Sequence, residues 1–179
     1  MRKSILHWMK IGTLYLLLCL TLSCLSSLGG LVNKQKIIKD RVLGIWNEGN
    51  LALINEVYAP EAIVRASHFP INIKGFEAIK NWIVTTRTAF PDFHMTFEEI
   101  IIKSDRVVTR WTTTGTNTGV LRIPFINLPP TGKKVRFSGI SISRVEKGKT
   151  VEEIIVFNVL EMFQQLGFKI IPPTIKEKK

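Results

Sequence analysis

The stretch that decides the fold is K-K-V-R-F-S-G-I-S-I-S-R-V-E-K-G-K-T-V-E-E-I-I-V-F-N, residues 133–158. Apolar and polar residues alternate on both sides of E-K-G-K, residues 146–149, as is typical of two β-strands joined by a tight turn. The sequence V-L-E-M-F-Q-Q-L-G-F follows at residues 159–168 with apolar residues at helical spacing. These patterns predict a β-hairpin closed by a short amphipathic helix.

Helices are expected upstream of the hairpin, because apolar residues recur at helical spacing and Gly49, Pro60 and Pro91 mark helix ends. The expected helices span residues 34–46, 51–58 and 75–89. The expected strands span residues 61–67, 93–103, 106–117, 134–145 and 150–159. Helices followed by a curved antiparallel sheet make an α+β fold. The proline-rich segment 119–132 is predicted to be a lid or the rim of a pocket.

The N-terminus, residues 1–30, is predicted to be a signal peptide or a lipoprotein leader. Basic residues precede an uncharged apolar run at residues 11–28, which is the layout of a secretory signal. Cys24 suggests lipid attachment at that residue, and the run also approaches the roughly 20 residues that an uncleaved anchor needs. All three interpretations place the protein outside the cytoplasm: exported, in the periplasm or outside the cell, or anchored to the membrane through its N-terminus.

The remaining chain is expected to form one domain, residues 33–168, followed by a basic disordered tail, residues 169–179. Both cysteines, Cys19 and Cys24, lie in the leader, so no disulfide is expected in the domain.

The chain is strongly basic, with a formal net charge of +11. A nucleic-acid-binding surface combines clustered basic residues with exposed aromatic residues. Here the basic surplus lies at residues 34–41, 133–136 and 176–179, which suits a solvated face near anionic lipid better. No nucleic acid is therefore expected as a partner, and the membrane is expected only through the leader or a lipid anchor.

Several motifs of cofactor and nucleophile chemistry are missing from the sequence. It has no H-x-x-x-H, no C-x-x-C, no glycine-rich phosphate loop and no G-x-S-x-G. The first two spacings serve metal ions, the third serves phosphates and the last serves a serine nucleophile. Neither a metal nor a cofactor is therefore expected.

Four motifs follow one another in the order of a known family: F-P-D at 90–92, P-P-T-G-K at 129–133, F-S-G-I at 137–140 and Q-Q-L-G at 164–167. With them the chain resembles the SnoaL-like polyketide cyclase (ester cyclase) family. The resemblance implies a nuclear-transport-factor-like fold. Such a fold is a cone-shaped curved antiparallel sheet packed on three helices, with a pocket at its open end.

The resemblance also implies an acid–base pair, a histidine fourteen residues before an aspartate. The aspartate removes an acidic proton next to a carbonyl, and a ring closes by an aldol step. The corresponding residues are interpreted here as Arg144 and Asn158. Asparagine is no base near neutral pH, whereas arginine stays protonated and can stabilise an enolate. These two candidate catalytic residues form either an oxyanion or carboxylate clamp, or a pair that satisfies each other or the backbone.

Strand alternation adds candidate contacts with the substrate. Ile142 shares a face with Arg144, and Val156 shares one with Asn158. This mixed row is expected to look into the pocket, which makes Ile142 and Val156 candidate substrate-binding residues.

Three more candidates lie outside the hairpin. His68 stands in a loop beside the expected mouth of the pocket. Arg110 and Trp111 alternate on a central strand, so one is expected to reach the pocket while the other packs beneath the helices. A core position is the more typical one for Trp111.

The other carboxylates receive structural interpretations. Asp92 is expected to begin a strand at a turn, and Glu152 to be a solvated cross-strand partner. Glu98 and Glu99 are neighbours on a strand, so they are expected to face opposite ways.

Two hypotheses for function remain open. The first is a cyclase or isomerase-type enzyme that works without a cofactor on a hydrophobic, carbonyl-bearing small molecule, using a replacement base. The second is a non-catalytic exported domain of the same fold that binds a ligand or a partner. A homodimer through the outer face of the sheet is expected from the resemblance.

Overall fold

The computed structural model describes residue 30, residues 32–66, 71–123 and 126–169, and residue 171. The expected leader with Cys24, the candidate His68 and nearly all of the expected tail therefore lie outside the described residues. The chain divides into two compact units, residues 1–38 and 39–179. In the first unit, residues 32–38 are helical. Among the described residues, no helix is long and apolar enough to cross a membrane.

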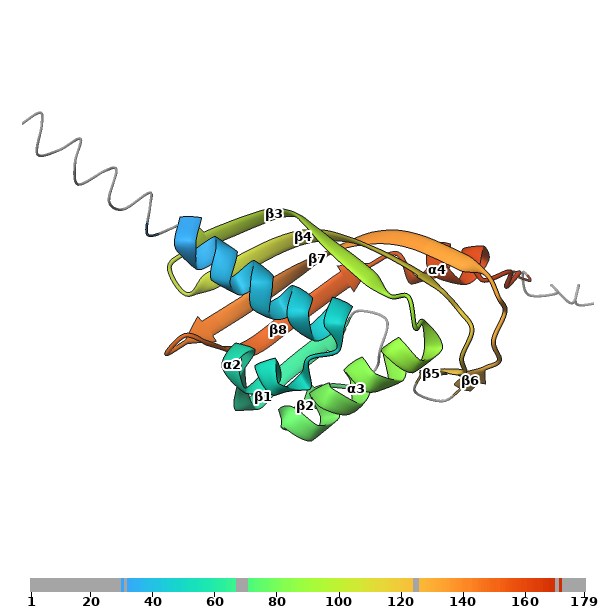
Figure 1. Ribbon diagram of the computed structural model, residues 1–179, viewed down its shortest axis with the longest axis horizontal. Helices are drawn as coiled ribbons and strands as arrows, with labels where there is room; N and C mark the ends of the chain where they lie inside the picture. The colour runs from blue at the N-terminus through green and yellow to red at the C-terminus, as the bar shows by residue number, and fades with distance from the viewer. Residues whose placement is uncertain (1–29, 31, 67–70, 124–125, 170, 172–179) are drawn as a thin grey trace, which may run out of the picture. The chain divides into compact units, whose positions relative to one another are not determined.

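The second unit is built on a six-stranded sheet in the order β2-β1-β8-β7-β4-β3 (Figure 1). Its strands are β1 (Tyr58–Ala66), β2 (Ile73–Lys74), β3 (His94–Lys103), β4 (Arg106–Thr116), β7 (Lys134–Glu146) and β8 (Lys149–Phe157). A separate two-stranded sheet pairs β5 (Leu121–Ile123) with β6 (Ile126–Leu128). The helices are residues 39–48, η1 (Leu51–Leu53), α2 (Ile54–Val57), α3 (Gly75–Ala89) and α4 (Val159–Gln165).

The predicted α+β fold with a curved sheet is confirmed. One pair departs from the expected antiparallel arrangement, because β1 runs parallel to β8. The chain leaves β1 through β2 and α3, reaches the far edge at β3 and returns strand by strand to β8. The direction of β8 is therefore set by this meander, and β1 meets it parallel.

The helix expected at residues 51–58 is shorter than predicted, because η1 and α2 end at Val57 and β1 already begins at Tyr58. Pro60 lies within this strand, where the register shifts between Tyr58 and Ile63. A proline is tolerated in a strand at such an irregularity, since no ladder hydrogen bond from its nitrogen is needed there.

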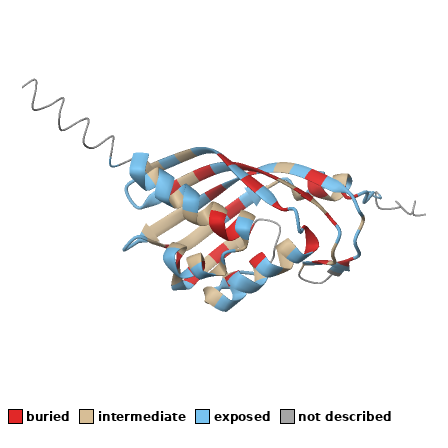
Figure 2. Cartoon of the chain, viewed as in Figure 1, coloured by how far each residue is buried: buried red, intermediate tan, exposed pale blue. Residues whose placement is uncertain are grey.

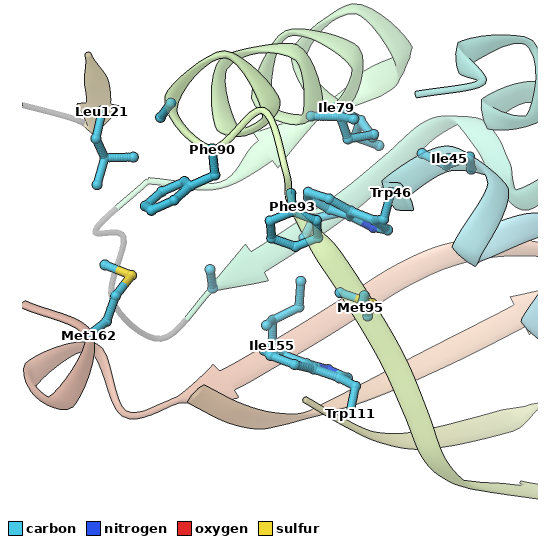
Figure 3. Packing of buried hydrophobic residues seen from close by; sticks show 14 of the residues in the cluster. Ile45, Trp46, Ile79, Phe90, Phe93, Met95, Trp111, Leu121, Ile155 and Met162 are labelled. Atoms are coloured by element: carbon cyan, nitrogen blue, oxygen red, sulfur yellow. The ribbon is translucent and has the colours of Figure 1, made fainter. Parts of the chain in front are cut away.

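Helices cover one face of the sheet, with α3 and α2 against β1 and α2 also against β8 (Figure 1). The buried residues gather between these layers (Figure 2). Trp46 packs edge-on against Trp82 at a centroid distance of 4.8 Å. Its ring also lies beside that of Phe93 (Figure 3), with the centroids 5.4 Å apart. The side chain of Asn47 fastens its helix to the sheet, because it donates to the Met95 carbonyl at 2.9 Å and accepts from the Met95 N–H at 2.7 Å.

The segment predicted to be a lid begins at a buried anchor. Asn117 is 1% exposed and donates to the carbonyl oxygens of Ala89 and Gly119, at 3.2 and 2.8 Å. Its Oδ1 accepts from the Thr131 N–H at 2.9 Å. These bonds join the two ends of the segment, so its base is fixed to the domain.

Asp92 has the structural role expected for it. Its carboxylate accepts from the backbone N–H of Thr116 at 2.5 Å and from the Thr116 hydroxyl at 2.7 Å. These two hydrogen bonds lower the pKa of Asp92 from its ordinary value. The residue therefore links the start of β3 to the end of β4.

Candidate functional site

The predicted hairpin is present as β7 and β8, and its cross-strand register shows which side chains share a face. Ile142 pairs with Ile154, and Ile140 pairs with Val156. All four lie on the side away from the helices, with relative exposures of 40%, 40%, 45% and 52%. We call these four residues the exposed apolar row. Ile142 and Val156 therefore lie on the exposed face of the sheet, and their role as substrate-binding residues stays a prediction.

Arg144 lies on the same exposed side and forms ion pairs. It pairs with Glu146, two residues further along β7, and its Nε lies 3.6 Å from a carboxylate oxygen of Glu152 on β8. Glu152 also pairs with Arg65 of β1. Glu152 is a cross-strand partner, as predicted, and its partners are arginines. Arg144 was expected to face the covered side and lies on the exposed side instead.

Asn158 is also placed differently from the prediction. It follows the last residue of β8 and caps α4, because its Oδ1 accepts from the backbone N–H of Glu161 at 3.1 Å. The side-chain oxygen is thus engaged by the helix start, and the residue is exposed. Arg144 and Asn158 do not meet; Arg144 pairs with Glu152 in the register. Catalytic roles for the two residues stay a prediction without geometric support.

Arg110 and Trp111 separate to the two sides of the sheet, as alternation predicts. Arg110 is exposed and forms ion pairs with Glu98 and Glu99. The expectation that these two carboxylates face opposite ways is wrong, because the register shifts between Phe97 and Glu99. Such a bulge adds one residue to the strand, so two neighbours turn to the same side.

On the covered side, four polar side chains lie in line across neighbouring strands, and we call them the inner polar chain: Trp111, Ser141, Glu153 and Tyr58. The indole Nε1–H of Trp111 donates to the Ser141 hydroxyl at 3.0 Å. Ser141 and Glu153 are diagonal neighbours on the covered face, because Ser141 pairs with Ile155 and Glu153 precedes Ile155 by two residues. From there the Ser141 hydroxyl lowers the pKa of Glu153. The Tyr58 hydroxyl donates to Glu153 Oε2 at 2.7 Å. Trp111 lies on β4, Ser141 on β7 and Glu153 on β8, and Tyr58 is the first residue of β1. Four strands thus bring these groups together.

Burial shifts the pKa values of the titratable groups in the inner polar chain. Tyr58 is 4% exposed and Ser141 is 7% exposed, whereas Glu153 as a residue is half-buried. Burial of its carboxyl raises the pKa of Glu153 above the ordinary value, and the bonds from Tyr58 and Ser141 offset part of that rise. Burial and the nearby carboxylate raise the pKa of Tyr58 well above its ordinary value. A carboxyl with these properties is a candidate general base.

The register also shows which two residues, fourteen positions apart in the sequence, face each other across β7 and β8. Ser141 and Ile155 are fourteen residues apart, pair directly and both lie on the covered side. Neither side chain is an acid or a base near neutral pH. Glu153 precedes Ile155 by two residues, so it lies on the same side, one step nearer the β7–β8 turn.

The remaining candidates give little chemistry. His94 is exposed at the start of β3. Within the described ranges, no group of three or more histidine, cysteine, aspartate or glutamate residues could hold a metal ion. Trp111 occupies the core as its type favours: it is 4% exposed and lies about 6 Å from Phe137 and Phe157, with centroid distances of 6.2 and 6.1 Å.

Comparison with solved structures finds the same fold in several bacterial proteins. TsrD from Streptomyces laurentii matches with a TM-score of 0.65 and 23% identity, over 75% of this chain and 96% of that one. IdmH from Streptomyces antibioticus matches with a TM-score of 0.57 and 28% identity, over 72% and 97%. A protein of ketosteroid isomerase-like fold from Catenulispora acidiphila, solved with trimethylamine, matches with a TM-score of 0.61 and 14% identity, over 74% and 93%.

A comparison with curated proteins found no match. The family model of the SnoaL-like polyketide cyclases matches residues 36–166, which contain the hairpin, the inner polar chain and the helices around them. The chain belongs to the SnoaL-like polyketide cyclase family.

Proposed function

We propose that this protein is a cofactor-free enzyme of the cyclase or isomerase type, in which Glu153 takes an acidic proton next to a carbonyl group of a hydrophobic small molecule. The observation that carries the proposal is the Glu153 carboxyl on the covered side of the sheet, hydrogen-bonded to Tyr58 and raised in pKa by burial. Membership of the SnoaL-like polyketide cyclase family supports the substrate class.

The chemistry needs only a base and a substrate with two carbonyl groups. The Glu153 carboxylate accepts the proton, and the electron pair of the broken C–H bond passes to the neighbouring carbonyl as an enolate. The enolate carbon attacks the second carbonyl, and Glu153 returns the proton to the new alkoxide. A pKa raised toward the working pH makes a carboxylate a better base for this step, because base strength rises with pKa.

A second candidate is a non-catalytic exported domain that binds a ligand or a partner. It is favoured by Ser141 and Ile155, which occupy the facing positions fourteen residues apart and supply no acid–base pair. Export through residues 1–30, with lipid on Cys24 as one form of it, belongs to both candidates. The mass of the mature protein checks the export proposal, since cleavage and lipidation each give a characteristic value.

The test is exchange of the acidic protons of hydrophobic 1,3-dicarbonyl probes with deuterated water, followed by NMR. This exchange reports proton removal whether or not a ring then closes. Glu153→Gln should lower the protein-catalysed rate by about 10²–10⁴-fold, because the amide is not a base. Glu152→Gln is the matched control, since the adjacent carboxylate lies on the exposed side; it should keep the rate.

Equal rates in both variants would contradict a role for Glu153 as the base. If the wild-type protein catalyses no exchange, native mass spectrometry of the protein purified from cells decides for the second candidate. In that case a bound hydrophobic molecule identifies a carrier, and an empty folded protein indicates an interaction domain.

A further inference from the structure

The hydroxyl of Ser141 has a defined direction of hydrogen bonding. An indole Nε1–H is only a donor, so at 3.0 Å the Ser141 oxygen must be the acceptor from Trp111. A hydroxyl has one proton, and the oxygen that accepts from Trp111 leaves this proton to be donated elsewhere. An ionised carboxylate is only an acceptor. From its diagonal position on the covered face, the Ser141 hydroxyl can therefore donate to the Glu153 carboxylate, which lowers the pKa of that carboxyl.

The position of the indole is fixed by a glycine. A β-carbon at Gly139 would lie 2.4 Å from both Cζ2 and Cη2 of Trp111 and 2.8 Å from the carbonyl oxygen of Val156. The indole thus occupies the space that a side chain at residue 139 would fill. The rings of Phe137 and Phe157, which stack on each other, also pack against the indole, at 6.2 and 6.1 Å between centroids. This packing fixes the direction of the N–H group.

We propose that Trp111 is a positioning residue for the Glu153 carboxylate and acts through the hydroxyl of Ser141. The proposal rests on the proposed function in so far as Glu153 is the base. Trp111 orients Ser141, and Ser141 presents its proton to one side of the carboxylate, while Tyr58 holds Oε2 from β1. The carboxylate is thereby held between two donors from different strands.

The experiment compares Trp111→Phe, Ser141→Ala and the double variant. Phenylalanine keeps an aromatic ring in the packing and removes the N–H donor. Two quantities are measured in the whole protein: the titration of the Glu153 carboxyl by carbon-13 NMR, and the exchange rate of the dicarbonyl probes. Phe137→Leu is the packing control, because Phe137 packs against the Trp111 ring with a side chain that can neither donate nor accept a hydrogen bond. Tyr58, the titratable group bonded to Glu153, is unchanged throughout.

We expect Trp111→Phe to move the Glu153 titration to higher pH, because a hydrogen bond to the ionised carboxylate lowers its pKa. Ser141→Ala should move it the same way, and Trp111→Phe should add nothing in the Ser141→Ala background. The exchange rate should nevertheless fall about three- to tenfold in each variant, because the lost orientation of the carboxylate outweighs its gain in base strength. Phe137→Leu should leave the titration in place.

Additive shifts in the double variant, or an unmoved titration in Trp111→Phe, would overturn the proposal. The NMR titration needs no substrate and so separates two failures. If the titration shifts follow this pattern but Glu153→Gln keeps full exchange activity, the positioning of the carboxylate is supported. In that case the proposed function of Glu153 as the base is contradicted.

Discussion

The two faces of the β7–β8 hairpin carry similar side chains and have very different surroundings. One face presents the exposed apolar row, with Arg144 and Glu152 paired at its end. The other presents Ser141, Glu153 and Ile155 beneath the helices. Both faces mix branched apolar residues with polar ones. The difference that matters is desolvation, because burial on the covered face raises the pKa of the Glu153 carboxyl.

The largest effect on stability is expected at Gly139, on the covered face. Gly139→Ala should lower the free energy of unfolding by about 2–3 kcal/mol, because the new methyl group overlaps the Trp111 ring and the Val156 carbonyl. Urea unfolding followed by circular dichroism measures the change. Ile140→Val, the next residue on the exposed face, is the control and should change it by less than about 0.5 kcal/mol. Equal losses in the two variants would show that the faces are not packed differently.

The helix and strand pattern could largely be predicted from the sequence. The helix at residues 75–89 matches α3, because Gly75 begins it and Pro91 follows its end. The long strands agree within a residue or two for the same reason, since turns with glycine or proline separate them. The helix at residues 51–58 was overestimated, because nothing local shows that Tyr58 already pairs with Thr150 of β8.

The candidate site could not be predicted in the same way, for two physical reasons. Alternation tells which residues share a face and not which face is covered, and here both faces of the hairpin contain isoleucines. The pKa of Glu153 is set by burial between the layers and by a hydrogen bond from Tyr58, which lies 95 residues earlier in the chain. The one available signal was Glu152-Glu153 itself: in a strand without a bulge, two adjacent carboxylates face opposite sides, so one of them is directed toward the helices.

An intermediate effect is expected where the inner polar chain loses a donor. Tyr58→Phe should cost about 1–2 kcal/mol near neutral pH, because a buried carboxylate loses a hydrogen bond. The bond favours the ionised form, so the variant raises the pKa of Glu153 further above its ordinary value. A raised carboxyl pKa lowers stability only when the group is ionised. The cost should therefore grow as pH rises through the folded-state pKa and shrink as pH falls toward the unfolded value of about 4.3.

Unfolding measured at about pH 4 and about pH 8 checks this sign. Glu152→Gln is the exposed-face control, because it breaks solvent-accessible ion pairs that are worth about 0–1 kcal/mol. A Tyr58→Phe loss that is larger at the lower pH would contradict the assignment of the Tyr58 bond to the ionised carboxylate.

The smallest effect on the monomer is expected on the exposed face, where the predicted homodimer would form. Ile142→Thr should change the free energy of unfolding by less than about 0.5 kcal/mol, because Ile142 keeps 40% of its surface in water. The same residue becomes decisive if two copies cover each other's exposed apolar row, since Ile142→Asp would then bury a carboxylate without a partner. Light scattering over a range of protein concentrations separates the cases. A dimer in the wild type that is lost in Ile142→Asp assigns this face to self-association, whereas a dimer that persists in Ile142→Asp, or a wild-type protein that stays monomeric, contradicts the predicted homodimer through this face.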